Sequence, residues 1–172
     1  MCNYFKSQTV NTGYPKHRVI EKDVFLNPVD IYSGIKNASK YLKSQNVPRK
    51  YRKQILQSFD IHTIKIKIAD DHTYGIRFYG GNSNLKGKYL FETFSQLTNR
   101  NNLALPYEWN DMTGIQQFKV REGTIIIVGR VAPQLSFSAS YIGGAYQWFI
   151  NDLENIEKHE ANSNSRTWFS LV

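Results

Sequence analysis

Apolar residues recur at helical spacing in two segments of the first third of the chain. The first segment follows Asn27-Pro28, a capping residue and a proline in the order that is typical of a helix start. The second segment begins at Pro48 and carries its charged residues away from its apolar stripe. The two stripes consist of Ile31, Ile35, Ala38 and Leu42, and of Tyr51, Ile55, Leu56 and Phe59. We therefore predict two amphipathic helices before residue 60.

From Thr63 the hydrophobic period changes to two, which indicates β-strands. In the first strand the apolar positions are Ile64, Ile66 and Ile68, which alternate with lysines. Further strands are expected at 73–79, 89–91, 118–121, 124–128 and 145–150, and a short helix at 152–160. This order predicts an α+β fold in which N-terminal helices precede a small, strongly twisted, mixed or antiparallel sheet.

The strand expected at 73–79 divides its side chains between two faces. Its alternation puts Phe78 on the face that should contact the core and Arg77 on the opposite face. A long polar connection follows at 98–113, and long loops inside a domain are usually functional or disordered. It holds apolar residues that predict a packed loop, namely Leu103, Leu105 and Trp109.

Composition narrows the class of protein. A length of 172 residues and a hydrophobic content of 41 % suit one domain with one core. The single cysteine, Cys2, excludes a disulfide framework and a thiolate zinc site. The pair Asp70-Asp71 suits a turn better than a calcium site, so no metal is expected. No long apolar run occurs, so we expect no stable membrane insertion.

The net charge of +8 is unevenly distributed. Residues 1–58 contain 11 Lys and Arg against 3 Asp and Glu, whereas residues 59–172 contain 11 of each. The whole excess therefore lies on the first third of the chain. We predict a basic helical lead-in or docking element at 1–58 and a charge-balanced domain that carries the chemistry at 59–172, with no nucleic acid as its partner.

Short runs in the second part could carry chemistry, although each has an ordinary structural alternative. Arg77 lies among aromatic residues and glycines and could bind a phosphate, or it could form a surface ion pair. The pair Gly143-Gly144 could bring the backbone close to a ligand, or simply turn the chain. Gln147 could lie at a pocket mouth, or be a buried structural amide.

Taken together, the runs form an ordered pattern over roughly residues 60–150. It consists of Arg77-Phe78-Tyr79-Gly80-Gly81, Tyr89-Leu90-Phe91, Arg100 with Leu105-Pro106, Phe118-Lys119-Val120, Gly123, Ala132-Pro133, and Gly143-Gly144-Ala145-Tyr146-Gln147-Trp148. This pattern resembles the NAD glycohydrolase domain named after tuberculosis necrotizing toxin, which ends many contact-dependent and polymorphic bacterial toxins. Ala145 replaces the third glycine of the family, and Tyr107 replaces its second proline.

The resemblance implies roles for single residues. It implies that Gln147 and Arg77 are catalytic and that Arg100 helps to bind the dinucleotide. Further substrate contacts are expected from Phe78, Tyr79, Gly80, Phe91, Gly143 and Gly144. NAD would be the substrate, so no cofactor is expected, and the fold would be related to that of the ADP-ribosyltransferases.

The resemblance also implies a biological setting. The chain would be a toxin effector domain, secreted as the C-terminal part of a larger protein, that acts in the cytoplasm of a target cell. It would deplete NAD there, with NADP as a further substrate to test. A cognate immunity protein would be its partner in the producing cell.

Three alternatives stay open at this point. ADP-ribosyltransferases usually carry a Glu two residues after a Gln or Glu, whereas position 149 is Phe, which favours water as the acceptor. A ribonuclease could use His62 and His72, but a predicted strand separates them. A binding module could use the basic helices against an immunity protein, a delivery partner or an acidic surface.

Overall fold

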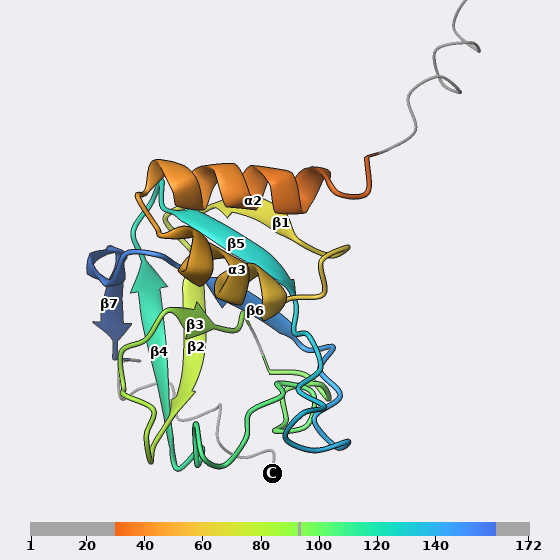
Figure 1. The fold of residues 1–172 in the computed structure, drawn as a ribbon. Helices are drawn as coiled ribbons and strands as arrows, with labels where there is room; N and C mark the ends of the chain where they lie inside the picture. The colour runs from red at the N-terminus through yellow and green to blue at the C-terminus, as the bar shows by residue number, and fades with distance from the viewer. Residues whose placement is uncertain (1–29, 93, 161–172) are drawn as a thin grey trace, which may run out of the picture. The chain divides into compact units, whose positions relative to one another are not determined.

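The computed structural model describes residues 30–92 and 94–160 of the chain. All of these except Asp30 belong to one compact unit, Ile31–Val172. In the described part of this unit, helices α2 (Ser33–Ser44) and α3 (Arg49–Gln57) precede the strands (Figure 1). The predicted α+β fold is confirmed. The proposed helix start at Asn27-Pro28 and the single cysteine lie outside the described residues.

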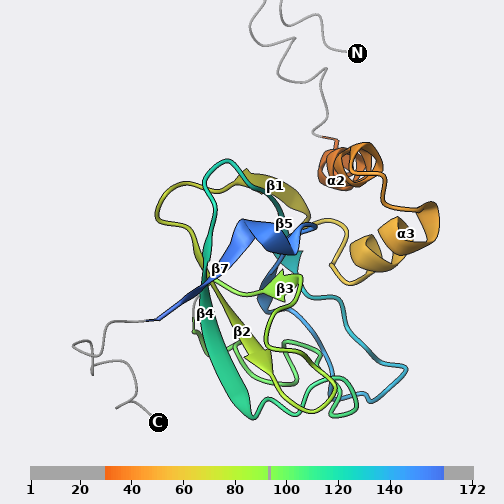
Figure 2. The same cartoon turned by 90° about the vertical axis from the view of Figure 1, so that its left-hand side faces the viewer.

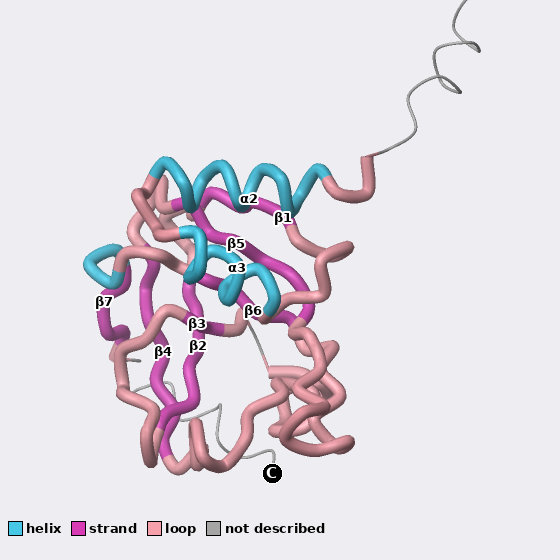
Figure 3. The backbone as a smooth tube through the Cα atoms, viewed as in Figure 1, coloured by secondary structure: helices cyan, strands magenta, loops and turns pink. Residues whose placement is uncertain are grey.

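The strands form two antiparallel sheets instead of the one sheet that we predicted (Figure 3). The four-stranded sheet has the order β1 (Lys65–Ile68), β5 (Ile125–Arg130), β6 (Tyr146–Phe149), β3 (Tyr89–Leu90). The three-stranded sheet has the order β2 (Tyr74–Tyr79), β4 (Gly114–Val120), β7 (Ile156–His159). Every described strand pair is antiparallel, so the mixed arrangement is excluded for these strands.

Strand β5 is buried on both faces, which explains its continuous apolar sequence. Ile126 and Val128 belong to a hydrophobic cluster that also contains Phe118 of β4 and Ile156 of β7. Ile127 points to the other face, into a cluster shared with the helices. In Figure 2 the four-stranded sheet accordingly lies between the helices and the three-stranded sheet. Side chains of a strand alternate between faces, so both faces need apolar residues here.

The two helices share their core with the four-stranded sheet. Ala38 and Leu42 of α2 have no exposed surface, and they pack with Leu56 of α3, Ile64 and Phe149. Helix α2 approaches residue 64 so closely that a Cβ at Gly34 would collide with the Ile64 carbonyl oxygen. The helices thus belong structurally with the strands, and a docking role for residues 1–58 stays a prediction. Neither described helix is long and apolar enough to span a membrane.

Two further sequence-based expectations were wrong. The acidic segment 152–160 forms a 3-10 turn (Leu153–Asn155) and strand β7, because Ile156 is fully buried and pairs with Val120 in the sheet. Ile66 and Ile68 are 37 % and 66 % exposed, although their alternation with lysines is typical of a half-buried strand. The hydrophobic cluster that the helices share includes Ile64, just before this edge strand, but neither Ile66 nor Ile68.

The long connection at 98–113 is packed, as predicted, although it contains no helix or strand. Leu103 and Ala104 form a third hydrophobic cluster with Val131, Tyr141 and Ala145. Trp109 is 44 % exposed, but its ring lies against that of Phe137, with the centroids 4.8 Å apart. The loops on either side of this cluster are therefore held together, at the end of the sheets away from α2 (Figure 3).

If the helices and sheets share one core, the Leu42→Ala variant should lower the free energy of unfolding by about 2–5 kcal/mol, because it leaves a cavity between α2 and β5. Urea denaturation should still show one transition. The matched control is Leu135→Ala, since Leu135 is 63 % exposed, and its change should stay within about 0.5 kcal/mol. Separate transitions for helices and sheets would contradict the shared core.

Candidate functional site

Residues far apart in the sequence enclose a cavity of about 50 Å³ beside the packed loop. Its lining consists of Arg77, Phe78, Tyr89, Leu90, Phe91, Leu103, Leu105, Asn110 and Gln147. The structure thus brings together Arg77, Phe78, Phe91 and Gln147 from the predicted site residues. They come from β2, from the residue after β3 and from β6.

Gln147 is held at the end of helix α3. Its amide Nε2 donates a hydrogen bond to the carbonyl oxygen of Ser58 at 2.9 Å, and Ser58 is the C-cap of α3. In the sheet, Gln147 lies opposite Gly129, whose missing side chain leaves room for Phe59. Among the described residues, no donor contacts the Gln147 Oε1 atom. The amide is therefore oriented by its nitrogen, and its oxygen can accept a hydrogen bond from a ligand hydroxyl.

Arg77 is a half-buried cation held by neutral oxygen atoms. Its Nη1 donates to the carbonyl oxygen of Tyr89 at 2.9 Å, its Nε to that of Asn84 at 3.1 Å, and its Nη2 to the Ser83 hydroxyl at 2.8 Å. A Cβ at Gly87 would collide with the guanidinium. Arg77 therefore does not leave the strand into solvent, as the alternation had suggested. It lies under the loop at 83–89.

The electrostatic setting of Arg77 favours an anion. Burial lowers the pKa of the Arg77 guanidinium, because it disfavours the charged form. No carboxylate forms an ion pair with Arg77 in the part of the chain that the structure describes. Two of its five N–H groups remain available after the three bonds to the loop. A phosphate that reached Arg77 would supply the missing negative charge.

Arg100 lies outside the cavity but shapes its wall. Its Nη1 donates to the carbonyl oxygens of Leu105 at 2.8 Å and Asn110 at 2.6 Å, and both of these residues line the cavity. The guanidinium also lies over the ring of Tyr107, 3.7 Å from the ring centroid. In this conformation Arg100 positions the loop at 98–113, and its predicted contact with substrate is not tested.

Tyr79 and the predicted glycines do not line the cavity either, and local backbone demands account for the glycines. Gly143 and Gly144 have φ values of +71° and +93°, which side chains rarely tolerate. A Cβ at Gly143 would also meet the carbonyl oxygen of Val131. Gly80 has a φ of +129° and lies against Asp111. Their predicted contacts with substrate remain predictions.

Sequence reasoning missed Asn110 and Ser58. Asn110 is 3 % exposed, donates from Nδ2 to the carbonyl oxygen of Phe78, and accepts from the backbone amide of Met112. Ser58 links the two sides of the site, because its hydroxyl oxygen also lies 3.3 Å from the Tyr89 hydroxyl oxygen, within hydrogen-bond distance. Burial raises the pKa of Tyr89, so its hydroxyl stays neutral near neutral pH. No sequence period marks these positions, since they act through tertiary contacts.

The residues considered for other chemistries lie elsewhere. His62 precedes β1 and has its ring 5.6 Å from that of Tyr32, whereas His72 follows β1 and contacts Asp71 at 3.4 Å. Neither histidine lines the cavity. Within the described residues, no group of three or more His, Cys, Asp or Glu comes together in a way that could hold a metal ion.

Comparisons with known proteins add information on the fold. No protein-family model and no curated protein matches the chain. One chain of the structure of Tse6 in complex with Tsi6 is similar with a TM-score of 0.62 at 12 % identity, over 78 % of this chain and 100 % of that one. One chain of the structure of Tne2 in complex with Tni2 gives 0.46 at 14 %, over 57 % and 88 %. The first likeness shows a shared fold, and the second is too weak to carry an argument.

The hydrogen bonds of Arg77 predict a measurable structural role. The Arg77→Met variant should lower the free energy of unfolding by about 2–3 kcal/mol, because it leaves the carbonyl oxygens of Tyr89 and Asn84 without their donor. Hydrogen exchange in residues 80–90 should accelerate. The control is Arg121→Met, whose side chain is 60 % exposed. Equal effects of both substitutions would show that Arg77 does not hold this loop.

Proposed function

We propose that this chain is a bacterial toxin effector domain that hydrolyses NAD to nicotinamide and ADP-ribose. One observation carries the proposal. Arg77, a half-buried cation with no carboxylate partner among the described residues, and Gln147, with an available amide oxygen, line the same cavity as Phe78 and Phe91. These are the residue types and the order that the resemblance to the necrotizing-toxin domain requires.

The chemistry of NAD suits a site without paired carboxylates. Water forms a bond to the ribose C1′ atom, the bond from C1′ to the pyridinium nitrogen breaks, and its electron pair neutralises the departing nicotinamide. The water proton leaves to solvent. Because the leaving group departs neutral, no general acid is needed, in contrast to ordinary glycosides. The site has to hold the ribose and stabilise an oxocarbenium-like transition state.

Four residues of the cavity have a part in this scheme. The Gln147 Oε1 atom would accept a hydrogen bond from a ribose hydroxyl and so orient the sugar. The two remaining N–H groups of Arg77 would bind the pyrophosphate. The rings of Phe78 and Phe91, whose centroids are 5.2 Å apart, offer a surface for the nicotinamide or the adenine.

Binding requires the cavity to widen. A volume of about 50 Å³ has room for ordered water but not for a dinucleotide. The loop at 98–113 forms one wall through Leu103, Leu105 and Asn110. Arg100 ties two of these residues together, so it would govern how far the wall moves. This gives Arg100 a positioning role beside the substrate contact that the resemblance implies.

Transfer of ADP-ribose to a protein is the nearest alternative, and the structure offers no support for it. Phe149 stands two residues after Gln147, where transferases usually carry a Glu. Its side chain is 1 % exposed and packs against Tyr89, with the ring centroids 5.1 Å apart. Because position 149 has no carboxylate, it offers no group that could activate a protein nucleophile. Water is therefore the favoured acceptor. The proposed relation to the ADP-ribosyltransferase fold rests on the resemblance alone.

The setting follows from the resemblance too. We infer a domain that is secreted as part of a larger toxin, acts in the cytoplasm of a target cell and is neutralised by a cognate immunity protein. The similar Tse6 structure is itself a complex of two proteins, Tse6 and Tsi6. That observation supports a protein partner for this chain as well. Neither nucleic acid nor stable membrane insertion belongs to the proposal.

The deciding experiment measures nicotinamide and ADP-ribose release from NAD by the purified chain. We expect free ADP-ribose, and a loss of about 100-fold or more in the Gln147→Ala variant, because the ribose loses its orienting acceptor. The matched control Gln96→Ala changes an exposed glutamine outside the cavity and should keep the activity.

Three outcomes would contradict the proposal. Equal activity of the two variants would remove Gln147 from the site. Nicotinamide release that needs a cell extract and labels a protein would indicate a transferase. A chain that is inert towards NAD and towards NADP, yet folded, would leave the fold assignment intact and remove the proposed substrate.

A further inference from the structure

A second and larger cavity adjoins the proposed catalytic site but is distinct from it. It has a volume of about 540 Å³ and is bounded by the connection between α2 and α3, by one side of α3, and by β3 and the end of β6. The lining consists of Gln45, Asn46, Val47, Pro48, Tyr51, Gln54, Ile55, Lys88, Tyr89, Phe149 and Asn151. Only Tyr89 lines both cavities, so a ligand in one does not occupy the other.

We propose that this second cavity binds an acidic segment of a partner protein through an apolar anchor side chain. The floor of the cavity is apolar: Val47, Ile55 and Phe149 contribute to it, and Tyr51 stands at its rim with 56 % of its surface exposed. A volume of this size falls in the range of about 300–1,000 Å³ that is typical of ligand sites. Exposed aromatic residues beside an apolar pocket are frequent anchor points of protein interfaces.

Carboxamide side chains favour a peptide in this cavity. Gln45, Asn46, Gln54 and Asn151 line it together. Each carboxamide has both a donor and an acceptor, which matches the alternating N–H and C=O groups of an extended backbone. These groups would satisfy the main chain of a segment whose apolar side chain enters the cavity.

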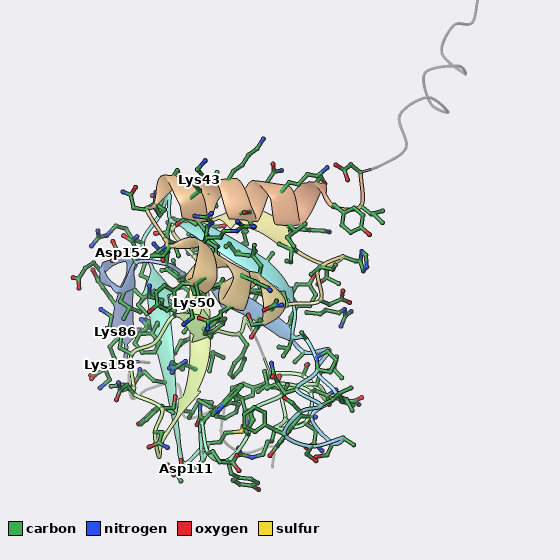
Figure 4. All side chains as sticks on the ribbon, viewed as in Figure 1. Lys43, Lys50, Lys86, Asp111, Asp152 and Lys158 are labelled. Atoms are coloured by element: carbon green, nitrogen blue, oxygen red, sulfur yellow. The ribbon has the colours of Figure 1, made fainter. Side chains whose placement is uncertain are left out.

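Charge around the cavity selects an acidic partner. No Asp or Glu lines it, whereas Lys88 does. Residues 31–58 contain seven Lys and Arg and no Asp or Glu, namely Lys36, Lys40, Lys43, Arg49, Lys50, Arg52 and Lys53. Figure 4 shows Lys43 on α2 and Lys50 on α3. Arg49, Lys50 and Lys53 are exposed, and none of the three forms an ion pair with a described carboxylate.

One acidic residue lies close to this surface. Asp152 directly follows Asn151, and the pKa of Tyr41 on α2 is raised by burial and, to a lesser extent, by the charge of Asp152. Lys88 and the exposed Arg49, Lys50 and Lys53 outnumber this carboxylate, so the surface around the cavity keeps a positive potential that attracts an acidic segment.

The arrangement fits a protein better than a nucleic acid or a membrane. Nucleic acids are bound by cations that follow several successive phosphates, with base contacts along the same track. Here the cations surround one cavity with an apolar floor and a carboxamide lining. A membrane surface would be met by a continuous apolar face, whereas the exposed side of α3 is basic.

The probe for this proposal is a short fluorescent peptide with a central Leu-Phe pair flanked by Asp and Glu. Its binding to the full chain is measured by fluorescence anisotropy in the absence of NAD. We expect the Kd to rise about tenfold in Lys88→Glu, and by a similar factor in Tyr51→Ala, and to rise further with salt. The matched control Lys65→Glu changes an exposed lysine on β1, at the opposite edge of the four-stranded sheet, and should stay within about twofold.

Circular dichroism confirms that each variant is folded before its Kd is compared. Equal weakening by Lys88→Glu and Lys65→Glu would overturn the proposal, because it would mean attraction by net charge without a site. So would tighter binding of an oligothymidine or of phosphatidylglycerol vesicles than of the acidic peptide. A peptide with alanines in place of the Leu-Phe pair should bind at least about tenfold more weakly, and equal binding would remove the anchor. These outcomes do not depend on whether the chain hydrolyses NAD.

Discussion

Strand β5 is the element on which the rest of the structure depends. Its adjacent residues Ile126 and Ile127 point to opposite faces of the sheet, and neither has any exposed surface. One face therefore requires the three-stranded sheet, and the other requires helices α2 and α3. Because the burial of apolar surface is the main favourable term in folding, this doubly buried strand fixes the order of layers. Without the three-stranded sheet Ile126 would be exposed to water, and without the helices Ile127 would be.

The proposed catalytic site is a consequence of that layering. Strand β6 pairs with β5, and its alternation puts Trp148 in one cluster and Phe149 in the other. Gln147 shares a face with Phe149, but it lies where helix α3 has already ended, so Ser58 rather than an apolar side chain meets it. A polar residue is tolerated at this edge because its amide has a partner there. Where the helix layer ends, the sheet opens towards the loops.

Most strands of the core could be predicted from the sequence. Their division into two separate sheets could not. Period-two alternation located β2 and the apolar run located β5, since both patterns follow from local geometry. Strand β7 was predicted as part of a helix because its segment is acidic and shows no alternation of apolar residues. The burial of Ile156 depends on its pairing with Val120 of β4, which is distant in the sequence. The resemblance implied that Gln147 and Arg77 share a site, and the structure brings both to one cavity, whereas only tertiary contacts show that Arg100 acts on the loop.

The two cavities would serve two different anions under the functions proposed for them. Both have a cation without a carboxylate among the residues that line them, Arg77 in the first and Lys88 in the second. A positive potential alone would not separate a dinucleotide from an acidic protein segment, since it acts over several ångströms on either. Shape has to do so. The first cavity is narrow and lined by the rings of Phe78 and Phe91, so that once widened it would suit a flat base and a phosphate. The second is roughly ten times larger and lined with carboxamides, which suits a peptide.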